Sequence, residues 1–125
     1  RPSGRPGEPM TRLLITLLFV GHGLVHGIMF ALPYSSKAIE DLPFNPSRSW
    51  LFGETKTLAF ASALVITLAF TVAAAGYLWR AGWWPELTIV AAVLSLALLS
   101  THFSTWWIAG FAINIAFAIF AWQNL

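Results

Sequence analysis

Apolar residues run along this chain in long blocks, and polar residues gather in the short stretches between them. Three blocks carry no formal charge, at residues 13–32, 57–79 and 87–125. About 20 apolar residues span the hydrocarbon core of a bilayer as a helix, so the third block is long enough for two helices. The polar cluster at 100–105 divides that block, and Ser104 or Thr105 is expected to cap the helix that follows.

The pattern predicts an all-α fold, namely a polytopic membrane protein with four transmembrane helices in a bundle. We expect the helices at about 12–32, 54–80, 85–102 and 105–123. Together they form one domain over residues 12–125, with a disordered tail rich in Pro and Gly at 1–11 and a loop at 33–53. Gly82 is expected to follow the second helix as its left-handed terminal residue.

Two further patterns refine this arrangement. Within the loop, Asn45 and Pro46 are expected to begin a short interfacial helix over 47–52, with Asn as N-cap and Pro as the first helical residue. Tryptophan favours the two membrane interfaces, and every tryptophan of the chain falls at a predicted helix end. These residues are Trp50, Trp79, Trp83, Trp84, Trp106, Trp107 and Trp122.

Composition supports a membrane location and excludes several classes of function. The chain is 58% hydrophobic and 10% charged, whereas soluble domains carry about 25% charged residues. The lipid bilayer is therefore its expected surroundings. The net charge of +2 comes from dispersed basic residues, so no basic face for nucleic acid is predicted. The absence of cysteine excludes disulfides and thiolate metal sites.

The distribution of basic residues predicts an orientation. If both termini are cytoplasmic, four basic residues lie inside and three lie outside: Arg1, Arg5, Arg12 and Arg80 against Lys37, Arg48 and Lys56. The positive-inside rule then favours an N-in, C-in protein.

Two histidines in the first helix are the strongest candidates for a functional site. His22 and His26 are four residues apart and share one helix face. Ionisable side chains inside a membrane are functional candidates by default because they are costly there. From the helical rise, His26 lies about 21 Å along its helix from Arg12, and His102 lies about 26 Å along the third helix from its start. We therefore expect all three histidines and Asn114 to converge inside the bundle.

Glycines surround the pair. Gly23 and Gly27 form a G-x-x-x-G pattern, which lets a neighbouring helix approach closely. Gly21 is interpreted in the same way, as a packing residue, and Asn114 as an interhelical hydrogen-bonding residue.

Four interpretations of the histidines stay open. In the first, they are neutral and hold helices together through Asn114, Ser100, Thr67 or Thr71. In the second, His22, His26 and His102 bind a metal ion, with Glu54 or Asp41 as further candidate ligands. In the third, haem or quinone is bound, with His22 or His26 paired to His102 across the bundle. In the fourth, the same residues line a path for protons or a solute.

No pattern for catalysis is present. The chain has no Gly-rich phosphate loop, no paired carboxylates and no nucleophile–base arrangement, and a His-Glu-x-x-His sequence is absent. We therefore predict no catalytic residues.

Several short motifs together resemble a group of small bacterial membrane proteins with four helices. The motifs are His22-Gly23-Leu24-Val25-His26, Ser47-Arg48, Trp83-Trp84 and Asn114. The resemblance covers most of the chain from Arg12 onward and implies the same fold and a bacterial inner membrane, but no activity. That group tends to carry a charged segment before its fourth helix, where this chain has Ser104-Thr105-Trp106-Trp107.

The sequence favours a non-catalytic accessory or structural subunit that packs against other integral membrane subunits or against a second copy of itself. Its small size, its lack of a soluble domain and its Gly-rich packing face support this hypothesis. The alternative is a metal- or haem-binding membrane protein that uses His22, His26 and His102.

Overall fold

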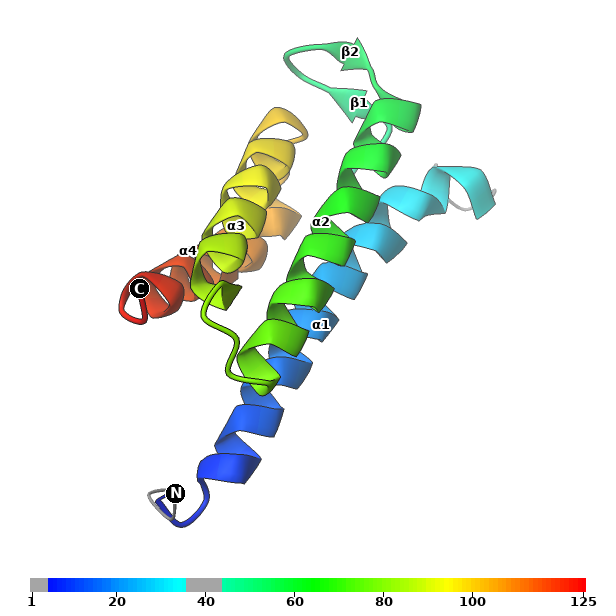
Figure 1. Ribbon diagram of the computed structural model, residues 1–125. Helices are drawn as coiled ribbons and strands as arrows, with labels where there is room; N and C mark the ends of the chain where they lie inside the picture. The colour runs from blue at the N-terminus through cyan, green and yellow to red at the C-terminus, as the bar shows by residue number, and fades with distance from the viewer. Residues whose placement is uncertain (1–4, 36–43) are drawn as a thin grey trace.

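The computed structural model describes residues 5–35 and 44–125. Four helices form a packed bundle: α1 (Glu8–Ser35), α2 (Lys56–Leu78), α3 (Trp84–Thr101) and α4 (Ile108–Trp122) (Figure 1). All four helical segments are long and apolar enough to cross a membrane. The fourth segment includes the short 3₁₀ helix η2 (Thr105–Trp107), which precedes α4. The predicted all-α, four-helix membrane bundle is confirmed.

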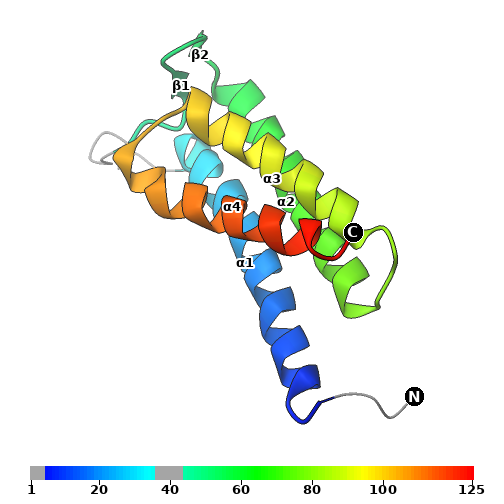
Figure 2. The same ribbon diagram turned by 90° about the vertical axis from the view of Figure 1, so that its left-hand side faces the viewer.

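The helices pack in chain order, α1 against α2, α2 against α3 and α3 against α4. Figure 2 shows α3 and α4 lying over α2 and α1. Aromatic rings from the other helices surround Phe19 of α1, which is fully buried. Its ring centroid lies 4.5 Å from that of Phe117 and 6.5 Å from that of Phe70. Edge-on ring contacts of this kind hold α1, α2 and α4 together.

The first helix is longer than predicted at both ends. It begins at Glu8, so residues 8–11, which were expected to belong to a disordered tail, are helical. Pro9 falls in the first turn, where its missing N–H costs nothing, and Glu8 complements the helix dipole there. At the other end the helix was expected to stop at about residue 32, but it continues to Ser35 with Pro33 in its last turn. The expectations for residues 1–4 and 36–43 lie outside the described residues.

The loop before α2 forms a hairpin, so the prediction of an interfacial helix was wrong. Strands β1 (Arg48–Ser49) and β2 (Gly53–Glu54) pair antiparallel, and Gly53 supplies the positive φ of 75° that the turn needs. The hairpin is anchored on the end of α3. Ser49 Oγ donates to the carbonyl of Thr101 at 2.6 Å, and Trp50 Nε1 donates to that of Ser100 at 2.5 Å. These bonds satisfy carbonyls that a helix end leaves unpaired, which explains why a hairpin is favoured here.

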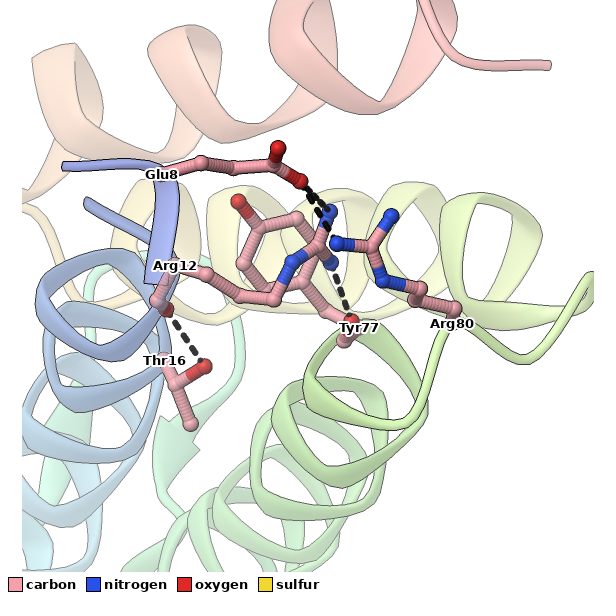
Figure 3. Close-up of polar contacts among 5 residues, drawn as sticks. All are labelled: Glu8, Arg12, Thr16, Tyr77 and Arg80. Atoms are coloured by element: carbon pink, nitrogen blue, oxygen red, sulfur yellow. Dashed lines mark hydrogen bonds and ion pairs between the residues drawn. The ribbon is translucent and has the colours of Figure 1, made fainter. Parts of the chain in front are cut away.

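A charged cluster ties the start of α1 to the end of α2 (Figure 3). Arg12 Nη1 donates to the carbonyl of Tyr77 at 2.6 Å, and its guanidinium lies 4.5 Å from the centre of the Tyr77 ring. Arg80 Nη2 lies 2.5 Å from Glu8 Oε1. The two ends are therefore joined by a hydrogen bond, a cation–π contact and an ion pair.

In the turn after α2, the residue with the left-handed conformation is not the predicted one. Arg80, and not Gly82, has a positive φ, of 59°. The N–H of Ala81 donates to the carbonyl of Gly76, and that of Arg80 donates to the carbonyl of Tyr77. This is the Schellman arrangement, which usually places Gly at the left-handed position. The strained backbone at Arg80 coincides with its ion pair to Glu8.

Candidate functional site

The face of α1 next to the histidines is packed directly on α2. A Cβ at Gly23 would lie 3.0 Å from Phe70 Cβ and 3.2 Å from the Thr67 carbonyl oxygen. A Cβ at Gly27 would lie 3.0 Å from Thr67 Oγ1. Thr67 Oγ1 in turn donates to the carbonyl of Gly23 at 2.6 Å. The two glycines thus bring α1 and α2 into close contact within this chain, whereas Gly21 is exposed and has nothing within 4 Å of the position of a Cβ.

This contact turns His22 and His26 toward the other two helices, where they enter a chain of buried hydrogen bonds. His22 Nε2 lies 3.0 Å from Asn114 Oδ1 on α4. Asn114 Nδ2 donates to Ser95 Oγ on α3 at 2.7 Å, and Ser95 Oγ also bonds to His26 Nε2. Asn114 and Ser95 are completely buried. We call these four side chains the His–Asn–Ser–His chain.

One backbone group sets the direction of every bond in this chain. His26 Nδ1 lies 2.9 Å from the carbonyl oxygen of His22, which can only accept, so Nδ1 carries the proton. His26 Nε2 is then an acceptor, and the hydroxyl of Ser95 donates a hydrogen bond to it. Asn114 Nδ2 donates to Ser95, which leaves Asn114 Oδ1 to accept from His22 Nε2–H. Each of the four bonds then has one donor and one acceptor, and His22 Nδ1 is the ring nitrogen left outside the network.

His102 lies apart from this chain. Its Nε2 lies 2.7 Å from Thr55 Oγ1, just before α2, and its Nδ1 lies 3.1 Å from the Leu98 carbonyl. The ring stands edge-on to that of Phe30, one turn beyond His26. Burial lowers the pKa of His102 below its usual value. The expected heights of His26 and His102 along their helices differ by about 5 Å, which is about one helical turn. This difference is enough for the two rings to make separate contacts.

The structure thus brings together His22, His26 and Asn114, but not His102. Within residues 5–35 and 44–125, no three His, Cys, Asp or Glu side chains are grouped so that they could hold a metal ion. Asp41, a further candidate ligand, lies outside the described residues.

Sequence analysis missed two partners of the histidines. Ser95 joins His26 to Asn114, and Thr55 meets His102. A signal for Ser95 was present, because it is the one polar residue in the apolar run 89–99. The interhelical bonds that were expected at Thr67 reach the backbone of Gly23 instead of a histidine.

An open groove lies beside the His–Asn–Ser–His chain, between α1 and α4. Its volume is about 590 Å³, and it is lined almost wholly by apolar side chains, several of them aromatic. His22 is half-buried and lies in its wall, as does Gly21. The groove exists because the backbones of α1 and α4 do not approach each other as the three sequential helix pairs do. We call it the α1–α4 groove.

These features define a class of protein, a bundle of four membrane-spanning helices with a hydrogen-bond chain between α1, α3 and α4 in its interior. No protein family, curated protein or solved structure matches the chain. Its function is therefore inferred from its own residues.

Proposed function

We propose that the protein is a non-catalytic subunit of an integral membrane assembly, and that a transmembrane helix of another subunit docks on α4. The observation that carries the proposal is a stripe of small residues on the outer side of α4. Ala109, Ala112 and Ala116 are all exposed, and their spacing of three and four places them on one face. Small residues at such spacing let two helices in a membrane approach closely.

The exposure of α4 supports this proposal. It is the least buried of the four helices, and only Asn114, Phe117 and Ala121 on it are buried. The hydrogen bonds of the His–Asn–Ser–His chain join α1, α3 and α4, so these polar side chains act as helix-to-helix contacts. Bonds of this kind contribute about 0.6 to 2 kcal/mol each in a membrane.

The alternative, a metal- or haem-binding protein, finds less support in the geometry. His22 and His26 are paired with Asn114 and Ser95, and His102 is paired with Thr55. Ligation by the three histidines together would require His26 and His102 to break their bonds to Ser95 and Thr55.

The subunit role is tested by the size of the assembly extracted from native membranes in a mild detergent. The wild type is expected in a complex much larger than its own 13.7 kDa. Ala112→Leu should release it, because a larger side chain separates the helices. Ala61→Leu, at an alanine on α2 that is also exposed, is the matched control and should leave the complex intact. A wild type that is a lone monomer, or a complex unaffected by Ala112→Leu, contradicts the proposal. A complex made of this chain alone identifies a second copy as the partner.

We also propose that the protein lies in a bacterial inner membrane with both termini inside. Arg12 and Arg80 are held together at one end of the bundle by Glu8, which supports that end as the cytoplasmic one. Because the chain has no cysteine, a single introduced cysteine shows on which side of the membrane its position lies. In spheroplasts, an impermeant maleimide should label Phe52→Cys directly, and Asn124→Cys only after permeabilisation. The reverse pattern contradicts this orientation.

A further inference from the structure

We propose that the α1–α4 groove binds a neutral, membrane-soluble phenol, whose hydroxyl donates a hydrogen bond to Nδ1 of His22. This inference goes beyond the subunit role and rests on His22 and the aromatic side chains of the groove, which Ala109 and Ala116 of the α4 stripe also line. It combines three observations, namely the unused nitrogen of His22, the shape of the groove and the aromatic character of its wall.

The first observation concerns the nitrogen. The His–Asn–Ser–His chain fixes the proton of His22 on Nε2, where it faces Asn114 Oδ1. Nδ1 is therefore an acceptor. No described residue bonds to it, whereas the corresponding atom of His26 is paired with the carbonyl of His22. An unpaired acceptor in an apolar membrane interior costs free energy that a donor recovers.

The second observation is that the acceptor belongs to a side chain in the wall of a pocket. The groove has a volume of about 590 Å³, within the range of about 300 to 1,000 Å³ typical of small-molecule sites. Its lining is apolar apart from the histidines, which is the usual composition of such a site, with few polar groups that fix orientation.

The third observation selects the chemical class. Phe30, Trp106, Trp107 and Phe117 all line the groove, and aromatic walls favour an aromatic ligand through edge and face contacts. A charged donor such as an ammonium is costly inside a membrane. The ligand must therefore donate a hydrogen bond without carrying charge, and a phenol combines an aromatic ring with such a donor.

A ligand that only accepts hydrogen bonds, such as a ketone, cannot take the place of the phenol. A ketone would need the proton of His22 on Nδ1, so Asn114 would have to turn its amide to donate to Nε2. Ser95 would then donate to Asn114, and His26 would carry its proton on Nε2. That would leave His26 Nδ1, now an acceptor, against the carbonyl of His22. The fixed direction of the chain therefore discriminates hydroxyl from carbonyl ligands.

The test compares 4-octylphenol with its methyl ether, which has the same apolar body but no donor. Both are titrated into the full chain in detergent, with empty micelles as background, and binding is followed by the ¹⁵N signals of the histidines. The phenol should bind about two- to tenfold more tightly than the ether, as one hydrogen bond predicts. It alone should shift the Nδ1 signal of His22. Equal affinities, or an unmoved Nδ1 signal, overturn the proposal.

Two variants separate the hydrogen bond from the groove. His22→Phe keeps the ring volume and should bring the affinity ratio to one. Gly21→Leu fills the groove where the structure leaves open space, so it should weaken both ligands and preserve the ratio. A ratio that persists in a folded His22→Phe protein overturns the proposal. If His22→Phe does not fold, the wild-type Nδ1 signal still decides between the two outcomes.

Discussion

Replacing Ser95 with alanine removes an oxygen that takes part in two interhelical hydrogen bonds. The oxygen accepts from Asn114 and donates to His26, and it is completely buried. Ser95→Ala therefore leaves an amide hydrogen and an imidazole nitrogen unpaired. Because Ser95 lies on α3, Asn114 on α4 and His26 on α1, the change weakens the contacts among three helices.

The magnitude follows from the number of bonds. Interhelical hydrogen bonds in membrane proteins average about 0.6 kcal/mol and reach about 1.7 kcal/mol. Two bonds therefore predict a loss of roughly 1 to 3 kcal/mol in the free energy of unfolding. The loss is expected near about 3 kcal/mol if no water reaches the unpaired Asn114 amide and His26 nitrogen.

The assay is reversible unfolding of the purified protein in mixed micelles with a rising fraction of denaturing detergent, followed by circular dichroism. Ser62→Ala is the matched control, because Ser62 is half-buried in α2 and makes no side-chain hydrogen bond to any described residue. It should stay within about 0.5 kcal/mol of the wild type. Combining Ser95→Ala with Asn114→Ala should cost less than the sum of the single changes, since they share a bond. A Ser95→Ala protein as stable as Ser62→Ala would refute the hydrogen-bond chain.

Three other changes test separate parts of the fold by the same unfolding assay. Gly23→Ala should destabilise by about 1 to 3 kcal/mol, because its Cβ would crowd Phe70, whereas Gly21→Ala should not; equal effects would contradict the close contact with α2. Arg80→Gly should be about 1 kcal/mol more stable than Arg80→Ala, because glycine accepts the φ of 59° freely; no difference would contradict this backbone conformation. Since burial lowers the pKa of His102 below 6.5 in the folded state, stability should fall as the pH drops below about 6.5 toward that lower folded value. His102→Asn should flatten this part of the pH profile, and an unchanged slope would contradict the burial of His102.

The helices could be predicted from the sequence because length and apolarity alone determine whether a segment can span a membrane. Their ends were less predictable. Pro33 is a helix breaker in general, yet one turn of helix accommodates it near the end of α1. The hairpin of β1 and β2 has strands of two residues, too short to show any periodicity. Its stability comes from carbonyls of α3 about 50 residues away, which no local pattern reveals.

The candidate site was only partly predictable for a related reason. The spacing of His22 and His26 fixes their common face, and the mid-helix position of Asn114 suggested its level. The faces that meet between two helices depend on the rotation of each helix about its axis. A single sequence does not give this rotation. Ser95 was missed for this reason, and His102 was placed too close to the pair.

The central claim, that the histidines form a directed hydrogen-bond chain inside the bundle, is tested most directly by their tautomers. Solid-state NMR of ¹⁵N-histidine-labelled protein in bilayers distinguishes a protonated from an unprotonated ring nitrogen. The structure predicts opposite tautomers for neighbours on one helix, with the proton on Nε2 in His22 and on Nδ1 in His26. The same tautomer in both residues, or rapid exchange of their protons with bulk water, would contradict it.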